Sequence, residues 1–370
     1  MQDKIQKTLF EPYTLGDLVL PNKFVMASLT RVRTDPKTGI ANDLMVEYYS
    51  QRASAGLILT EAACVSNASN SFPGSPAIYN KEQMEGWKKV VDGVHKKGGR
   101  IFIQIIHGGR AAHPEQTGEQ NISSSAVAIR GNIRKNLPHV QPKAMTTEDF
   151  ETVRQQFRQS ALYAKEAGFD GIELHGANGY LIDQFLRDGV NQRTDEYGGS
   201  IENRSRFPLE IIDIFIEIFG AKRVGIKLSP VGRFQDMYDS NPVALSSYLL
   251  QQLDKRGISY VQLMEPRDQV SGEVFYEPGE KQIAEVCKTL RPYFKGTLMI
   301  NNNLTPESAT NALNEGVADL ACFGRYFISN PDFVERVQND WALNEWDPKT
   351  FYVGGEKGYI DYPVYQSQKI

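Results

Sequence analysis

The sequence predicts an α/β fold, a single (β/α)8 TIM barrel, because eight short apolar runs alternate with eight amphipathic stretches along the chain. Most of the runs are apolar throughout, which is typical of parallel strands buried on both faces. Eight strands, each followed by a helix, is the number that closes such a barrel. Barrels of this type reach about 400 residues as one unit. We therefore expect one domain over residues 1–370.

The expected elements follow one another in a regular order. The strands are Lys23–Leu29, Gly56–Glu61, Arg100–Ile106, Asp170–His175, Arg223–Leu228, Tyr260–Met264, Thr297–Ile300 and Asp319–Phe323. The helices are Asp43–Ala55, Lys81–Lys97, Thr147–Ala167, Asn203–Phe219, Pro242–Lys255, Lys281–Leu290, Pro306–Glu315 and Pro331–Trp341. Proline after a capping side chain, at Thr305-Pro306 and Asn330-Pro331, indicates two helix starts. The segment His107–Met145 predicts an extended functional loop after the third strand.

The composition excludes several classes of protein. With 41 basic and 45 acidic residues and no basic block, nucleic acid is not an expected partner. The chain shows neither an apolar stretch that could span a membrane nor a secretory signal, so we expect a cytoplasmic protein. Cys64, Cys287 and Cys322 are scattered, which excludes a disulfide framework and a four-cysteine iron–sulfur cluster. The five histidines form no metal-binding motif, so no metal is expected.

A group of polar side chains, His175, Asn178 and Tyr180, follows the fourth strand. Active sites of such barrels form at the carboxyl ends of the strands. His175 and Asn178 can donate hydrogen bonds to a carbonyl oxygen as negative charge develops on it. A phenol with a pKa of about 10 stays protonated at neutral pH, so Tyr180 suits a general acid. A structural reading, with His175 in the core and Asn178 as a helix cap, is equally compatible with these residues alone.

Phosphate binding is indicated after strands seven and eight, where barrels commonly hold this group. These positions read Asn301-Asn302-Asn303 and Gly324-Arg325. A glycine lets backbone N–H groups approach an anion, and a guanidinium offers a fork of donors. The alternative is a turn glycine beside a surface arginine. Lys227, on the fifth strand, could form a Schiff base, bind an anion or stabilise a reduced cofactor.

Several stretches occur together in an order that resembles the Old Yellow Enzyme family over nearly the whole chain. They are Leu20–Lys23 leading to Thr30-Arg31, Glu47–Ala53, Ala55–Ile58, Gln104–Gly109, His175–Tyr180, Asn191–Ser200, Gly324-Arg325 and Gly358–Pro363. The resemblance implies tightly bound FMN, with NADPH or NADH as a transient hydride donor in a ping-pong cycle. It implies a small-molecule acceptor. This is an α,β-unsaturated carbonyl such as an oxylipin-like enone, or else a quinone or a nitro compound. The protein is expected to be a monomer or a homodimer.

The resemblance also implies which residues bind the flavin ring. Thr30 is expected to hydrogen-bond the flavin carbonyl beside N5, with Ser28 and Leu29 next to it. Ala62 and Gln104 are expected to line the isoalloxazine.

The other implied cofactor contacts lie at the two ends of the flavin. Lys227 is expected near the N1 edge, where a cation favours the anionic reduced form. Asn301, Asn302, Gly324 and Arg325 are expected to hold the FMN phosphate.

For the acceptor, the resemblance implies that His175 and Asn178 bind its carbonyl oxygen and that Tyr180 gives a proton to its α-carbon. His175 would contact the flavin as well as the substrate. Ile106 and Tyr352 are expected to border the substrate pocket.

The chain departs from the family pattern at four places. Ser28 replaces a common proline, and Lys227 replaces the usual arginine, losing its forked geometry. Ile106 replaces a frequent tryptophan, which predicts a roomier pocket that admits bulky or flipped enones. Asn301–Asn303 replace a glycine-containing turn.

Three other interpretations of the sequence predict different properties. A lyase using Lys227 as a Schiff base would be colourless. The larger dienoyl-CoA reductase type needs clustered cysteines that this chain lacks. A non-catalytic barrel would not need the donor set at His175.

Overall fold

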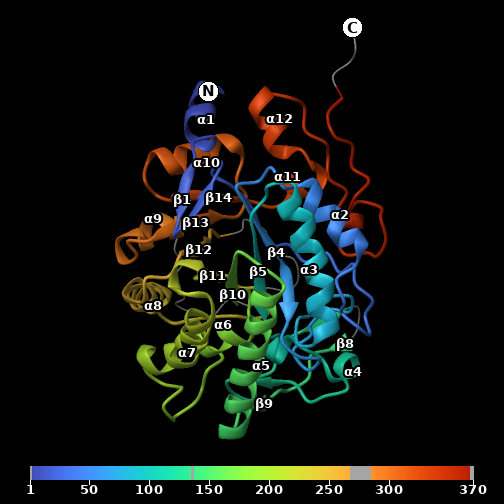
Figure 1. Cartoon of the computed structure of the whole chain (residues 1–370). Coiled ribbons are helices and arrows are strands. Elements are labelled where there is room, and N and C mark those ends of the chain that lie inside the picture. Colours follow the sequence, from blue (N-terminus) through green and yellow to red (C-terminus); the bar gives the residue numbers. More distant parts are fainter. Residues whose placement is uncertain (1, 135–136, 267–284, 367–370) are drawn as a thin grey trace.

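The structure, a computed structural model, describes residues 2–134, 137–266 and 285–366. Eight parallel strands form a closed barrel in sequence order, and β14 pairs with β3 to close it. The predicted (β/α)8 barrel is therefore confirmed (Figure 1). The strands are β3 (Phe24–Met26), β4 (Leu57–Cys64), β5 (Ile101–Ile106), β10 (Gly171–Gly176), β11 (Val224–Leu228), β12 (Tyr260–Met264), β13 (Thr297–Asn301) and β14 (Leu320–Phe323).

Helices cover the outside of the barrel, as predicted, with α3, α5, α7 and α8 visible around it in Figure 1. Their bounds are α2 (Asp43–Gln51), α3 (Lys81–Lys96), α5 (Thr147–Glu166), α7 (Ile201–Phe219), α8 (Pro242–Arg256), α9 (Val286–Leu290), α10 (Pro306–Asn314) and α12 (Phe333–Asn339). Residues 281–284 of the expected helix Lys281–Leu290 lie outside the described residues.

Of the two predicted proline helix starts, one is confirmed and one is wrong. Thr305 caps α10, and its side chain accepts the Ser308 N–H. The start at Asn330-Pro331 is wrong, because α12 begins only at Phe333. The Asn330 side chain instead donates to Tyr326 O (2.9 Å) and accepts the Asn344 N–H (2.7 Å).

Two amino-terminal elements were not predicted from the sequence pattern. An antiparallel hairpin of β1 (Tyr13–Leu15) and β2 (Leu18–Leu20) closes the amino-terminal end of the barrel, whereas α1 (Gln2–Leu9), at the top of Figure 1, packs against α10 outside it. Leu15 and Leu20 are fully buried and pack with Phe102 and Tyr260 from the strands. Three-residue strands are too short to give a periodic signal.

The extended loop after β5 is confirmed and carries short elements of its own. They are η1 (Gly109–Ala111), α4 (Pro114–Thr117), β6 (Ile122–Ser123), β7 (Asn132–Arg134), β8 (Leu137–Pro138) and β9 (Lys143–Ala144). Buried Arg110 fastens this loop to the segment after β11, donating to Val127 O (3.1 Å) and Gln235 O (2.9 Å). The loop therefore covers the carboxyl end of the barrel, where the predicted site lies.

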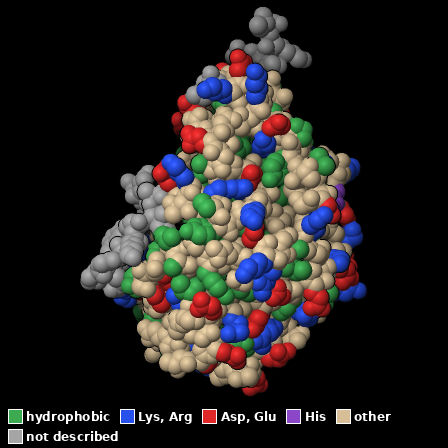
Figure 2. Space-filling model, turned by 90° about the vertical axis from the view of Figure 1, so that its left-hand side faces the viewer, with side chains coloured by type: hydrophobic (Ala, Val, Ile, Leu, Met, Phe, Trp, Pro, Cys, Tyr) green, Lys and Arg blue, Asp and Glu red, His purple; other side chains and the backbone are tan. Residues whose placement is uncertain are grey.

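The remaining short elements connect the barrel units. They are α6 (Leu181–Leu186), η2 (Ala221–Arg223), η3 (Arg291–Tyr293), α11 (Arg325–Ser329) and η4 (Pro348–Thr350). On the face shown in Figure 2, basic and acidic side chains are interspersed, without a patch of one sign. Within the described ranges, none of the helices is long and apolar enough to cross a membrane.

Candidate active site

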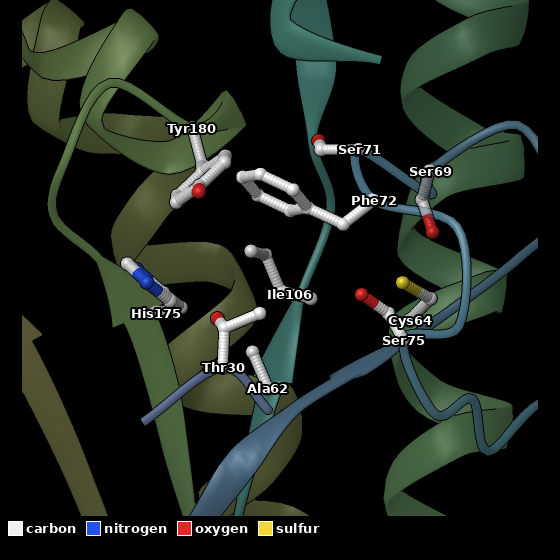
Figure 3. A pocket seen from close by; sticks show the side chains of 10 residues that line it. All are labelled: Thr30, Ala62, Cys64, Ser69, Ser71, Phe72, Ser75, Ile106, His175 and Tyr180. Carbon is white, nitrogen blue, oxygen red and sulfur yellow. The ribbon is translucent and has the colours of Figure 1, made fainter. Parts of the chain in front are cut away.

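The carboxyl ends of neighbouring barrel strands bring together residues that are far apart in sequence. Thr30 after β3, Ala62 on β4, Ile106 at the end of β5 and His175 on β10 line one pocket (Figure 3). The cavity measures about 20 Å³, room for roughly one water molecule. Tyr180 completes this wall. The structure thus unites five of the predicted site residues: Thr30, Ala62, Ile106, His175 and Tyr180.

His175 is a buried, neutral hydrogen-bond donor. Its Nδ1 accepts the N–H of Ala177 (3.3 Å), so the ring proton lies on Nε2. Burial, and then the positive charge of Lys227, hold the pKa of His175 well below its usual value. A buried imidazole that stays neutral at pH 7 can donate from Nε2 without the cost of burying a charge.

The turn after β10 is held in a left-handed conformation by buried side chains. Asn178 has φ +58° and Gly179 has φ +75°. The Asn178 N–H donates to Ser229 Oγ (2.8 Å), and the Gly179 N–H donates to Asp183 Oδ2 (2.9 Å). Asp183 is in turn paired with buried Arg187 at 2.9 Å. The hydrogen bonds to Ser229 and Asp183 therefore fix the backbone that carries Asn178 and Tyr180.

The Asn178 side chain is half-buried and is not among the residues that line the cavity. Within the described part of the chain its carboxamide makes no hydrogen bond, and only its backbone N–H is engaged. Its amide group is therefore available to a ligand at the mouth.

Tyr180 is buried and protonated. Burial raises its pKa, the neighbouring Tyr352 and Cys64 raise it further, and a hydrogen bond with Gln235 lowers it. Its ring meets the His175 imidazole edge to face, with centroids 4.8 Å apart. A donor and a proton source thus lie side by side on one wall of the pocket.

The opposite wall comes from the end of β4 and the loop after it, which the sequence analysis did not assign to the site. Figure 3 shows the Phe72 ring reaching across the pocket toward Tyr180, with Cys64, Ser69 and Ser75 on the far side. Burial raises the pKa of Cys64 to about 12, so its thiol is not a nucleophile at neutral pH. The available signal was position alone, since this long loop follows a barrel strand at its carboxyl end.

Beneath the pocket lies a layer of buried polar side chains. Gln104, 2% exposed, donates to Ser28 Oγ at 2.8 Å. Lys227, 5% exposed, lies with its Nζ 3.2 Å from the same hydroxyl. The strand β3 is fully buried, and the residues that follow it, Ser28, Leu29 and Thr30, are half-buried. The chain therefore reaches the mouth of the barrel at these three residues. The predicted cofactor residues of β3, β5 and β11 therefore meet.

The predicted phosphate residues lie at the ends of β13 and β14. Within the described ranges, no hydrogen bond uses the backbone N–H groups of Asn302, Asn303, Gly324 or Arg325. A Cβ at Gly324 would meet only Leu29, at 3.4 Å. The Arg325 guanidinium is exposed and rests over the Trp346 ring at 5.8 Å. Four open N–H donors beside a guanidinium suit a phosphate dianion, so these residues fit the end of FMN.

Two of the predicted phosphate side chains are engaged inside the protein instead. The Asn301 carboxamide donates to Gln262 Oε1, within the barrel. The Asn302 carboxamide donates to Glu265 O (2.8 Å). At Asn302, therefore, the backbone is the group that is open to a ligand.

Tyr352 lies apart from the cavity lining. It is 66% exposed on the segment before the carboxyl terminus, and its ring contacts Phe351 edge to face. It raises the pKa of Tyr180, so the two phenols lie near enough to interact electrostatically. Among the described residues, no group of three or more His, Cys, Asp or Glu side chains could hold a metal ion.

Comparisons with known proteins agree with this geometry. A model of the NADH:flavin oxidoreductase / NADH oxidase family matches residues 8–344. The chain is 42% identical over 365 residues to a probable flavin mononucleotide-dependent alkene reductase of Leishmania infantum, which covers 96% of this chain and 97% of that one. It is 40% identical to 12-oxophytodienoate reductase 7 of Oryza sativa subsp. japonica, covering 98% and 96% of the two chains.

Solved structures give the same result. Morphinone reductase in complex with tetrahydroNAD superposes with a TM-score of 0.90 at 41% identity, over 98% of this chain and 99% of that one. The old yellow enzyme homologue from Zymomonas mobilis gives a TM-score of 0.91 at 35% identity, over 97% and 100% of the chains. The chain therefore belongs to the NADH:flavin oxidoreductase / NADH oxidase family, and it is an FMN-dependent oxidoreductase of the Old Yellow Enzyme type that takes its electrons from a nicotinamide.

Proposed function

We propose that this chain, as one FMN-binding barrel domain, reduces the C=C bond of α,β-unsaturated carbonyl compounds with electrons from NADPH or NADH. FMN, when bound and reduced by the nicotinamide, would supply the hydride for the β-carbon from its N5 atom. His175 Nε2 and the Asn178 amide donate to the carbonyl oxygen of the acceptor. Tyr180 gives its proton to the α-carbon.

The observation that carries this proposal is the contact between a neutral imidazole donor and a protonated phenol in one pocket. Reduction of an enone builds negative charge on the carbonyl oxygen, which hydrogen-bond donors stabilise. It also needs one proton, which a group with a raised pKa retains until it is needed. His175 and Tyr180 meet these two requirements within 4.8 Å between ring centroids.

The names of the relatives support a substrate of this class. They denote reduction of an alkene, an oxophytodienoate and morphinone. Quinones and nitro compounds are also electron-poor molecules with an oxygen that the donors would bind, so the proposal includes them as acceptors of the same site. Membership in a flavin oxidoreductase family argues against the Schiff-base lyase that Lys227 also permitted.

The test uses purified holoprotein, 2-cyclohexenone as acceptor and the variant His175→Ala. We expect wild type to be yellow and to consume NADPH or NADH with the enone. His175→Ala should keep its FMN while enone turnover falls about 10²- to 10³-fold, the typical effect of losing one such donor. The matched control is His95→Ala, which changes an exposed histidine on α3. A variant at His175 with wild-type turnover, or a wild type that takes up no flavin, would refute the proposal.

A further inference from the structure

A fully buried carboxylate lies below the pocket, at the centre of the polar layer. Glu173 on β10 is 0% exposed and stands two residues before His175. It accepts three hydrogen bonds: from Gln104 Nε2 at 2.6 Å, from the Tyr260 hydroxyl at 3.0 Å and from Gln262 Nε2 at 2.9 Å. A charged carboxylate is the form that accepts from three donors at once.

The two glutamine amides that donate to Glu173 are oriented by hydrogen bonds to other residues. Gln262 uses its Oε1 to accept from Asn301 Nδ2, so its Nε2 must face Glu173. Gln104 uses its Nε2 for both Ser28 Oγ (2.8 Å) and Glu173 Oε1. Both hydrogens of that amide are then occupied, and its carbonyl oxygen is the atom left for a ligand.

The charge of Glu173 is opposed by one nearby cation. Lys227 lies on the adjacent strand β11, where it pairs in register with His175. Glu173 and Lys227 both stand on inward-facing positions, because side chains alternate along a strand. Burial raises the pKa of Glu173 above its usual value, and Lys227 and the three donors only reduce that rise. Three hydrogen-bond donors and a nearby cation therefore lower the cost of burying a charge on this carboxylate.

The hydrogen-bond network of Glu173 lies next to the residues that are proposed to contact the flavin. Strand register places Ala62, Gln104 and Glu173 side by side across β4, β5 and β10. Ala62 lines the pocket together with Thr30 and His175. The pyrimidine half of an isoalloxazine carries an N–H donor beside acceptor atoms. A carbonyl oxygen on Gln104 and an ammonium on Lys227 are the complement of that edge.

We propose that Glu173 is a positioning residue for the flavin, which sets the reduction potential of FMN by orienting the Gln104 amide and by countering the charge of Lys227. The inference rests on the proposed placement of the ring at Gln104 and Lys227. In that placement Glu173 itself would not touch the cofactor. Without its negative charge, Lys227 would present a full positive charge to the flavin and would favour the reduced, anionic form.

The experiment compares wild type with Glu173→Gln, which keeps the shape and removes the charge. Midpoint potentials of bound FMN are measured by equilibrium titration against a reference dye, and affinity for oxidised FMN is measured by fluorescence. We expect the preference for reduced over oxidised FMN, expressed as the ratio of the two affinities, to be about tenfold or more higher in the variant than in wild type. This is the effect expected from removing one charge in a partly screened protein interior. The potential therefore moves in the positive direction. An unchanged potential in a flavin-loaded variant overturns the inference.

Two further variants separate charge from orientation. The double variant Glu173→Gln/Lys227→Met restores the net charge, so its potential should return toward the wild-type value; a potential that stays with the single variant contradicts the charge argument. If Glu173→Gln yields no folded protein, Glu173→Asp decides in its place. It keeps the charge but shortens the reach to Gln104, so weaker FMN binding with a near-native potential supports the inference, and unchanged affinity overturns it.

These results are distinguishable from failure of the proposed function. If the flavin binds and the potential shifts as expected but enones are not reduced, the acceptor proposal fails and the role of Glu173 stands. If wild type reduces enones and Glu173→Gln keeps the wild-type potential, only the role of Glu173 fails.

Discussion

The imidazole of His175 and the phenol of Tyr180 meet edge to face, with centroids 4.8 Å apart and an interplanar angle of 81°. The contact depends on the turn between them, in which Asn178 and Gly179 both adopt positive φ. Such a turn reverses the chain at the end of β10 and returns Tyr180 to the wall that His175 already occupies. One sharp turn therefore unites the two groups that an enone reductase needs.

Replacement of Tyr180 by phenylalanine should separate the two halves of the catalytic cycle. The ring and its contact with His175 remain, and only the proton source is lost. Flavin reduction by the nicotinamide should be unaffected, whereas reoxidation by an enone should slow about 10²- to 10⁴-fold, the usual contribution of a general acid. Stopped-flow measurement of each half-reaction checks this. Equal rates in both halves for wild type and Tyr180→Phe would show that the proton comes from elsewhere.

The reoxidation rate should be insensitive to pH across the neutral range. The pKa of His175 lies well below its usual value and that of Tyr180 lies above 10. His175 thus gains a proton only in acid, and Tyr180 loses its proton only in strong base. We expect a plateau from about pH 6.5 to about pH 10, the unperturbed values of the two groups. Single-turnover rates against pH test it, and a break near pH 8 in wild type would contradict the assignment. In Tyr180→Phe any alkaline limb should disappear.

Asp183 should be essential for the stability of the turn. It accepts the Gly179 N–H at 2.9 Å and pairs with Arg187 at 2.9 Å, with both side chains buried. Breaking a buried pair at one partner typically costs about 3–5 kcal/mol. Urea unfolding of Asp183→Asn should show a loss of that order in the free energy of unfolding.

The control for this change is an exposed ion pair on a helix. Asp92 pairs with Lys88 at 2.9 Å on α3, where the side chains are 61% and 48% exposed. Asp92→Asn should cost no more than about 1 kcal/mol. Equal losses for the two variants would mean that the turn does not depend on the Asp183–Arg187 pair.

The barrel and its mouth could be predicted from the sequence because buried parallel strands leave continuous apolar runs. The error at the second strand has a physical cause. The sequence predicts its end at Glu61, but β4 runs to Cys64, because its pairing with β5 resumes at Ala62 after a register shift that follows Leu59. An irregularity in a ladder depends on the neighbouring strand and leaves no mark in the periodicity of one strand.

The details of the site could be predicted only where a local pattern marks them. His175, Asn178 and Tyr180 stand within six residues and form a recognisable group. Phe72 gave no such signal, because it reaches the pocket from a long loop after β4. The role of Glu173 was equally hidden, since its donors come from β5 and β12, far away in sequence. Tertiary contacts of this kind depend on strand register, which cannot be read from a local sequence pattern.

Restoring a tryptophan at position 106 should narrow the range of acceptors. Ile106 is 7% exposed at the end of β5 and packs with Cys64 and Tyr180 along the pocket wall. An indole there would occupy space that a bulky enone needs, so Ile106→Trp should reject bulky substituents and change the stereochemical outcome for enones that bind in a flipped orientation. The fit is tight, and overpacking of this kind typically costs about 1–3 kcal/mol in stability. Ile106→Leu keeps the volume and serves as the control. Product enantiomers from a series of enones of increasing size, separated by chiral chromatography, check the prediction. The same product ratios for wild type, Ile106→Leu and Ile106→Trp across that series would show that this wall does not set the orientation of the substrate.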